Sequence, residues 1–108
     1  MNAMVIFISC QDKTEAERIS ELLLKEKLAA CCTISSSVNS IFLWPPGKGQ
    51  LDYADECLLI VKTLETKWEA LEERVLAVHS YDNPEILALP VVHGSKKYIS
   101  WMEHELSK

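Results

Sequence analysis

A run of thirteen residues, 32–44, most constrains what this chain can fold into. Its alternation places Ile34, Val38, Phe42 and Trp44 on one face of a strand, and the following PPGKG segment predicts a turn. At ~3.3 Å per residue the strand spans about 43 Å. A compact domain of about 100 residues is about 35 Å across. The run therefore predicts a hairpin, returning through residues 55–63, that extends beyond its own domain.

The far half of this hairpin carries the apolar run from Ile41 to Trp44. A lone subunit would expose both an unpaired strand edge and this apolar surface to water. A closed oligomer removes both liabilities, and we therefore expect a homo-oligomer. The alternative is a bulge in the SSSVNS segment that folds the distal part back onto its own sheet.

The remaining pattern predicts alternating strands and helices. Residues 4–9 read as a central strand, and residues 14–29 as a helix capped by Asp12 or Thr14. A second helix runs from the cap Thr66 to near His79, and residues 85–92 form a strand. Pro90 places that strand at an edge or a bulge, and a short helix from residue 95 closes the chain. This order predicts one α+β domain over residues 1–108, a ferredoxin-like βαββαβ sandwich with a long hairpin between its second and third strands and an extra C-terminal helix.

Charge and cysteine content exclude several classes of protein. The formal net charge is −5 without a basic run, which argues against a nucleic-acid partner. The apolar run 4–8 is too short for a membrane span or a signal segment, so we expect no membrane association and a cytoplasmic location. The cysteines are Cys10, Cys31, Cys32 and Cys57, and no two of them form a C-x-x-C pair. We therefore expect reduced thiols and neither a disulfide framework nor a structural zinc site.

Residues 77–94 concentrate side chains that can carry chemistry. His79, Tyr81, Asp82 and Glu85 surround an Asn-Pro pair in the segment that enters the last strand. A turn explains the Asp, Asn and Pro adequately. It does not require an imidazole, a phenol and two carboxylates together, and this surplus favours a pocket for an ion or small ligand.

Two interpretations of His79 remain open. It can end the second helix and interact with that helix's free carbonyls and dipole. It can also be an imidazole ligand for Cu(II) or Zn(II), completed by Glu56 and by a sulfur from another subunit. Glu56 itself is also explained as a solvated strand end. Lys62 lies about 20 Å further along that strand, so it could meet an acidic group only across an interface.

Three segments of the chain resemble the CutA divalent-cation tolerance proteins. They are ERISELLLKEKLAACCTISSSVNSIFLW, ECLLIVKT and HSYDNPEILALPVVHGSKKYISWM, and together they cover nearly the whole sequence. Within them the KLAAC helix end, the Trp before the turn, the KT strand end, the His-x-Tyr corner, PEI-x-ALP and the final Tyr-x-x-Trp occur in the family's order.

The resemblance implies a trimer assembled through the extended hairpins, weak binding of copper or another divalent cation, and a role in metal tolerance without an established reaction. It implies metal ligands at His79, Glu56 and Cys10. The chain departs from the family pattern in four places. The corner reads His-Ser-Tyr-Asp instead of His-Pro-Tyr-Glu, and the family's cysteine position falls on Ile8. In addition, Phe42 stands where Tyr is common, and the PPGKGQLDYA turn is longer. Cys10 faces the same side only if the first strand continues past Ser9.

An intersubunit pocket is the second expectation for this chain. Its predicted lining is Trp44, Lys62, Tyr81, Asp82 and Glu85. We expect no enzyme, because the chain lacks a Gly-rich phosphate loop and its two arginines lie in predicted helices. Two functions remain: a trimeric copper or divalent-cation binding protein for metal tolerance, and a trimeric signalling or adaptor protein. The latter would receive a small metabolite or a loop of an unknown protein partner in its clefts.

Overall fold

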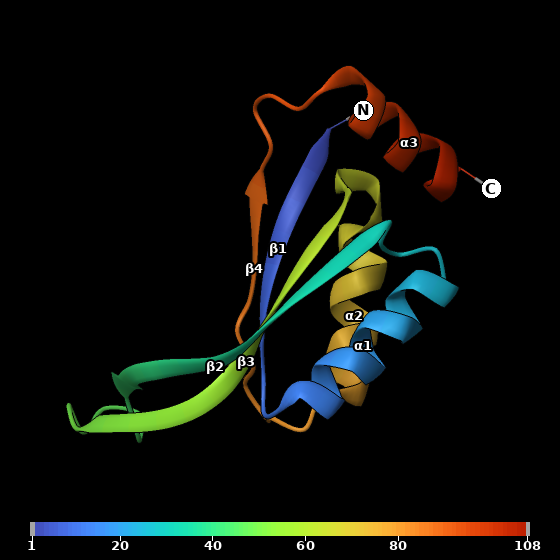
Figure 1. The fold of residues 1–108 in the computed structure, drawn as a ribbon. Coiled ribbons are helices and arrows are strands. Elements are labelled where there is room, and N and C mark those ends of the chain that lie inside the picture. Colours follow the sequence, from blue (N-terminus) through green and yellow to red (C-terminus); the bar gives the residue numbers. More distant parts are fainter. Residues whose placement is uncertain (1, 108) are drawn as a thin grey trace.

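The computed structural model describes residues 2–107 and forms one antiparallel sheet with helices on one face (Figure 1). The strands are β1 (Ala3–Cys10), β2 (Cys31–Leu43), β3 (Leu51–Leu64) and β4 (Ile86–Pro90). The helices are α1 (Lys13–Lys25), the short 3₁₀ helix η1 (Glu65–Lys67), α2 (Trp68–Val78) and α3 (Lys96–Leu106).

The sheet has the order β2-β3-β1-β4, with α1 and α2 packed against one face and α3 near the start of β1 (Figure 1). This is the predicted α+β arrangement, including the extra C-terminal helix. β1 lies between β3 and β4, and β4 is an edge strand, as Pro90 predicts. None of the helices within residues 2–107 is both long and apolar enough to cross a membrane.

The core lies between the helices and the sheet, because side chains of each strand alternate between the two faces. On β1, Ile6, Ile8 and Cys10 point to the helices and are completely buried. They pack in one cluster with residues of β3 and of both helices, among them Leu59, Val61, Ile19, Leu23, Leu71 and Val75. Burying each large aliphatic side chain contributes ~1.5–3 kcal/mol, so this cluster is the main support of the fold.

The element ends differ from the sequence predictions where local backbone geometry decides. α1 ends at Lys25 instead of residue 29, because Lys27 takes a left-handed conformation with φ 60°. β3 begins at Leu51 instead of residue 55 because it pairs along the whole hairpin. Thr66 does not cap α2; it lies inside η1, and neither η1 nor α2 has a side-chain cap.

The hairpin of β2 and β3 contains a bulge and also extends beyond the body of the molecule (Figure 1). The register shifts between Ser35 and Val38, where Ser37 has φ 62°. The bulge does not fold the distal arm back, since pairing continues from Val38 to Leu43 and the longest dimension of the chain is 45 Å. The turn takes positive φ at Gly47 and Gly49, where a glycine avoids the steric cost of a side chain.

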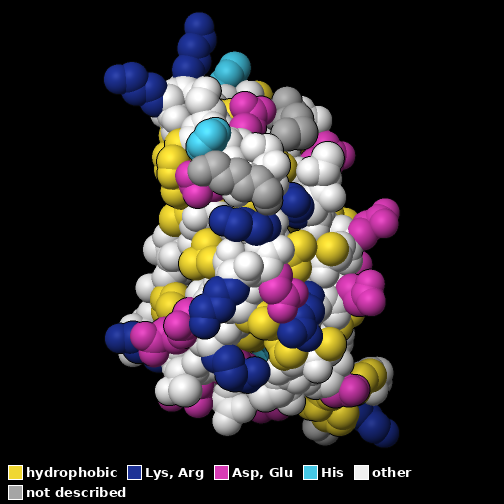
Figure 2. Space-filling view, turned by 90° about the vertical axis from the view of Figure 1, so that its right-hand side faces the viewer, with side chains coloured by type: hydrophobic (Ala, Val, Ile, Leu, Met, Phe, Trp, Pro, Cys, Tyr) yellow, Lys and Arg dark blue, Asp and Glu magenta, His cyan; other side chains and the backbone are white. Residues whose placement is uncertain are grey.

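Two apolar surfaces are left uncovered in the single chain. The arm exposes a set of large side chains on both of its strands: Ile41, Phe42, Leu43, Trp44, Leu51 and Tyr53. The second surface is the sheet face opposite the helices, where Leu87 and Leu89 of β4 are more than half exposed and flank Phe7 and Val5 of β1. The helical side, by contrast, carries interspersed charges of both signs (Figure 2).

Candidate functional site

The residues of interest gather at the end of β1 where the corner segment 79–85 crosses it. Strand β1 continues to Cys10, so Cys10 lies on the same face as Ile8, which is the helical face. Ser9, one residue earlier, points to the opposite face. The two faces of one strand end therefore carry two separate groups of polar side chains.

Glu15 is the central residue on the helical face. Asp12 caps α1 by accepting a hydrogen bond from the Glu15 N–H (2.8 Å), as the Asp-x-x-Glu spacing predicts. The Glu15 carboxylate accepts hydrogen bonds from the backbone N–H of Gln11 (2.8 Å) and of Ser80 (2.8 Å). Only 5% of its side chain is exposed. A single carboxylate thus joins the start of α1 to the corner segment.

Burial and hydrogen bonding act on the Glu15 pKa in opposite directions. Burial raises it, because the charged form loses water. The hydrogen bonds from Gln11 and Ser80 lower it, His79 adds to the lowering, and the net pKa lies below the ordinary value. Glu15 is consequently a buried anion whose charge is stabilised by backbone donors.

His79 lies directly after α2, and its imidazole is fully buried. Nδ1 accepts a hydrogen bond from the Tyr81 N–H (3.0 Å), so the ring proton is on Nε2, which donates to the Ser9 carbonyl (2.6 Å). The ring does not bond the free carbonyls of its own helix; it joins the corner to β1. Both nitrogens are occupied, which leaves no lone pair for a metal ion.

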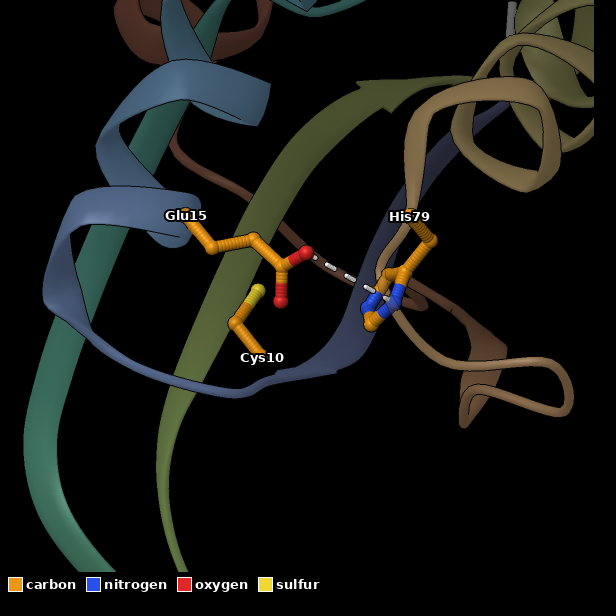
Figure 3. Close-up of side chains that lie close together, drawn as sticks. All are labelled: Cys10, Glu15 and His79. Carbon is orange, nitrogen blue, oxygen red and sulfur yellow. Dashed lines mark ion pairs between the residues drawn. The ribbon is translucent and has the colours of Figure 1, made fainter.

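Cys10, Glu15 and His79 form a compact cluster, with ligand atoms all within 4.8 Å of one another (Figure 3). His79 Nδ1 lies 3.9 Å from a Glu15 oxygen. Burial, followed by the nearby Glu15 charge, raises the pKa of the Cys10 thiol to about 12, so the thiol stays protonated at neutral pH. A metal ion would require that thiol's proton to leave and the hydrogen bonds of Glu15 and His79 to break. The donor atoms are close together but do not fit a resident cation.

The opposite face carries an open cleft of about 830 Å³ between the arm and the corner. Its lining combines aromatic and acidic side chains. The lining is Ser9, Ser40, Ile41, Phe42, Leu43, Trp44, Asp52, Tyr53, Ala54, Glu56, Tyr81, Asp82, Asn83 and Glu85. No Lys, Arg or His is among these residues, so this surface favours a positively charged ligand.

Glu56 and Glu85 interact through their charges in this cleft. Glu56 accepts a hydrogen bond from Ser40 (Oγ to Oε2, 3.3 Å), and its charge acts on the nearby Tyr81 hydroxyl. Burial raises the pKa of Tyr81 to about 12, and the Glu56 charge contributes. Burial and then the Glu56 charge raise the pKa of Glu85 above its ordinary value. A cation between the two carboxylates would relieve this repulsion, and oxygen donors suit a divalent ion.

The structure distributes the predicted site residues over three places. Trp44, Tyr81, Asp82 and Glu85 line the cleft together with Glu56, all from one chain. Cys10 and His79 lie behind it in the buried cluster, apart from Glu56.

Lys62 lies outside the cleft, toward the other end of β3. Its Nζ donates to the Thr33 hydroxyl and lies 3.9 Å from the Cys31 sulfur.

Glu15 is the residue that sequence reasoning did not select. The Asp-x-x-Glu spacing predicts its role in capping α1. Its second role, as acceptor for the Ser80 N–H, depends on a contact across 65 positions of the chain. That contact has no counterpart in local spacing, so no sequence signal could have identified it.

Comparisons with known proteins agree with this fold. Residues 4–105 match the family model described as CutA1 divalent ion tolerance protein. The chain is 40% identical over 102 residues to the chloroplastic protein CutA 1 of Oryza sativa subsp. japonica, covering 94% of this chain and 56% of that protein. It is 38% identical over 98 residues to the divalent-cation tolerance protein CutA of Thermus thermophilus, covering 91% of this chain and 92% of that protein.

Solved structures of such proteins are also similar. The periplasmic divalent cation tolerance protein CutA from Archaeoglobus fulgidus superposes with a TM-score of 0.90 at 36% identity, covering 96% of this chain and 98% of that one. CutA1 from Oryza sativa superposes with a TM-score of 0.91 at 35% identity, covering 97% and 94%. The chain spans only slightly more than half the length of the chloroplastic relatives, 56% and 54%.

Proposed function

The chain belongs to the CutA1 divalent ion tolerance family, and on that premise we propose that it is a non-enzymatic, cytoplasmic homotrimer that binds a divalent cation weakly as part of metal tolerance. We assign the cation to the open cleft, with Glu56 and Glu85 as the principal ligands. Cu(II) is one candidate ion, because the family resemblance points to copper.

One observation carries this assignment: Glu56 and Glu85 are two mutually repelling carboxylates in a cleft without any basic side chain. Within residues 2–107, no hydrogen bond reaches the Glu85 carboxylate, so its oxygens are available to a ligand. The bound ion would neutralise the pair. The buried cluster of Cys10, Glu15 and His79 offers no comparable free donor.

Calorimetric titration with Zn(II) and Cu(II) tests the assignment. Loss of a residue that only hydrogen-bonds to a metal ligand lowers metal affinity ~10–100-fold. Loss of a ligand itself should weaken binding at least as much. We therefore expect Glu85→Gln to reduce the affinity by at least ~10-fold. Glu105→Gln on α3, outside the cleft, is the matched control and should bind as the wild type does. Equal metal affinities for Glu85→Gln and Glu105→Gln would show that the cation does not bind in the cleft.

The trimer is supported by the two uncovered apolar surfaces described above. A projecting arm with Leu43 and Leu51 each more than 60% exposed, and an open sheet face, are what one subunit can offer to another. Sedimentation equilibrium should give a mass three times that of the 12.2 kDa chain. Leu43→Lys should lower the mass, whereas Leu76→Lys, at an exposed leucine of α2, should not. A monomeric wild type at micromolar concentration would contradict the proposal.

The aromatic side chains that line the cleft favour a second candidate function, that of a trimeric signalling or adaptor protein. Phe42, Trp44 and Tyr53 offer ring surface that a bare metal ion does not need. A small metabolite or a loop of a protein partner would use it. Such a ligand should change the fluorescence of Trp44 and protect it from quenching, and Trp44→Leu should abolish that change.

A further inference from the structure

We propose that Glu15 and His79 are positioning residues: they hold Tyr81 and Glu85 in place for the cation in the cleft and do not bind it themselves. The inference rests on the proposed function, because it concerns the same cation site. The buried cluster of Cys10, Glu15 and His79 would thus support the cation site that lies on the opposite face of β1.

The first connection runs through Glu15. Its carboxylate binds the N–H of Gln11, just before α1, and the N–H of Ser80, the residue before Tyr81. Because both contacts are charge-assisted and shielded in part from water, they are among the stronger hydrogen bonds of the corner. The backbone that carries Tyr81 is therefore attached to the start of α1.

The second connection runs through His79. Its Nδ1 accepts the Tyr81 N–H (3.0 Å), and its ring packs against the Tyr81 ring with 4.9 Å between centroids. Its Nε2 donates to the Ser9 carbonyl (2.6 Å). The imidazole thus links the corner to the end of β1, and it restrains the Tyr81 ring, which lines the cleft together with Glu56.

Ser9 continues the connection to Glu85. The Ser9 N–H donates to the Glu85 carbonyl (3.3 Å), and the Glu85 N–H donates to the Ser9 hydroxyl (3.2 Å). His79 therefore fixes Ser9 through the Ser9 carbonyl, and Ser9 in turn fixes the backbone of Glu85 through its own N–H and hydroxyl groups. Every path from the cluster ends on a residue that lines the cleft.

Partners of this kind tune a metal site without touching the ion, and their loss costs ~10–100-fold in metal affinity. Glu15→Gln is the sharpest test, because the amide keeps the shape of the side chain but turns a donor toward the N–H of Gln11 or Ser80. We expect Zn(II) affinity to fall by ~10–100-fold. Glu17→Gln makes the same change at an exposed position of α1 and should leave the affinity unchanged.

A spectroscopic measurement separates positioning from direct ligation. The chain has three histidines, so replacing His93 and His104 by Asn leaves His79 as the only imidazole. In that background we expect the pulsed electron paramagnetic resonance spectrum of bound Cu(II) to lack coupling to an imidazole nitrogen. A clear coupling would overturn the proposal, and this result does not require any variant at position 79 to fold.

The outcomes also distinguish this inference from the proposed function. If Glu85→Gln binds Zn(II) as tightly as the wild type, the cation site itself is misplaced. If Glu85→Gln weakens binding and Glu15→Gln behaves like Glu17→Gln, the site stands and the positioning role is wrong. Titrations at low temperature, with near-ultraviolet circular dichroism showing native packing, exclude unfolding as the cause of weakened binding.

Discussion

The buried cluster and the open cleft lie on opposite faces of the same strand end, yet their ionisable groups have opposite properties. In the cluster, hydrogen-bond donors hold the pKa of the Glu15 carboxyl below its ordinary value; in the cleft, burial and then the Glu56 charge raise the pKa of Glu85. The cluster has closely spaced ligand atoms that are all in use, and the cleft has free ones. The comparison shows that closeness of donor atoms does not by itself make a metal site.

The largest expected effect comes from removing the central acceptor of the cluster. Glu15→Ala removes the acceptor of two partly buried hydrogen bonds, those from the N–H groups of Gln11 and Ser80. A donor left without its partner costs ~1–3 kcal/mol when buried and less where water reaches it, so we expect the free energy of unfolding to fall by about 2 kcal/mol in urea titrations. Glu85→Ala should change it by less than ~0.5 kcal/mol. Similar losses in both variants would abolish the distinction between the two regions.

The pH dependence of stability should have opposite signs in the two regions. A lowered folded pKa means that Glu15 contributes stability above its ordinary pKa and loses it as the pH falls. A raised folded pKa means that Glu85 contributes stability below its ordinary pKa and loses it as the pH rises.

Urea midpoints measured from about pH 3 to pH 7 check these signs. Relative to the wild type, Glu15→Gln should become progressively less stable as the pH rises, and Glu85→Gln progressively more stable. Slopes of the same sign for the two variants would contradict the assigned environments.

Thiol reactivity sharpens the comparison further. A thiolate ligand site would make Cys10 reactive, but its raised pKa, about 12, predicts an inert thiol. Burial likewise raises the pKa of Cys32 to about 11, and Cys57 is buried. At pH 8 we expect a thiol reagent to label Cys31 first and Cys10 only after unfolding. Peptide mapping would reveal the order, and early labelling of Cys10 would argue for an activated thiol in the cluster.

The smallest expected effect concerns the edge of the cluster. Arg18 lies 3.4 Å from a Glu15 oxygen, but 54% of its side chain is exposed. Exposed ion pairs contribute ~0–1 kcal/mol, and Arg18→Gln should therefore lower stability by less than ~0.5 kcal/mol and leave Zn(II) affinity unchanged. A loss approaching that of Glu15→Ala would mean that the ion pair, and not the backbone donors, stabilises the buried carboxylate.

Much of the fold could be predicted from local patterns. Apolar runs and alternation predicted all four strands, and Pro90 predicted that the last strand lies at an edge or bulges, because ladder hydrogen bonds exclude proline from central positions. The Asp12 cap of α1 was also predictable. The end of α1 could not be predicted, because the left-handed position after the helix is occupied by Lys27 and not by the glycine that usually marks a helix end. Thr66 was misread because cap spacing alone cannot distinguish a 3₁₀ turn from the start of a helix.

The site was predictable only in part. The corner residues Tyr81, Asp82 and Glu85 stood out by composition, and the structure places them along one cleft with Trp44 and Glu56. His79 stood out for the same reason, but its surroundings show a hydrogen-bonded link and no free donor. Residue type reveals what a side chain can do, whereas its partners decide which of those possibilities is still available.

By itself, the sequence determined the strand order along the chain, the overlong hairpin and the acidic, imidazole-bearing corner, because these follow from periodicity and residue chemistry over short distances. Only the tertiary structure decided which side chains share a face and which are already bonded. Cys10 and Ser9 are neighbours in sequence, yet the pleat of β1 sends one into the core and the other to the cleft. The Glu15–Ser80 and His79–Ser9 contacts join residues more than 60 positions apart, and they form only after packing has brought the corner against the sheet.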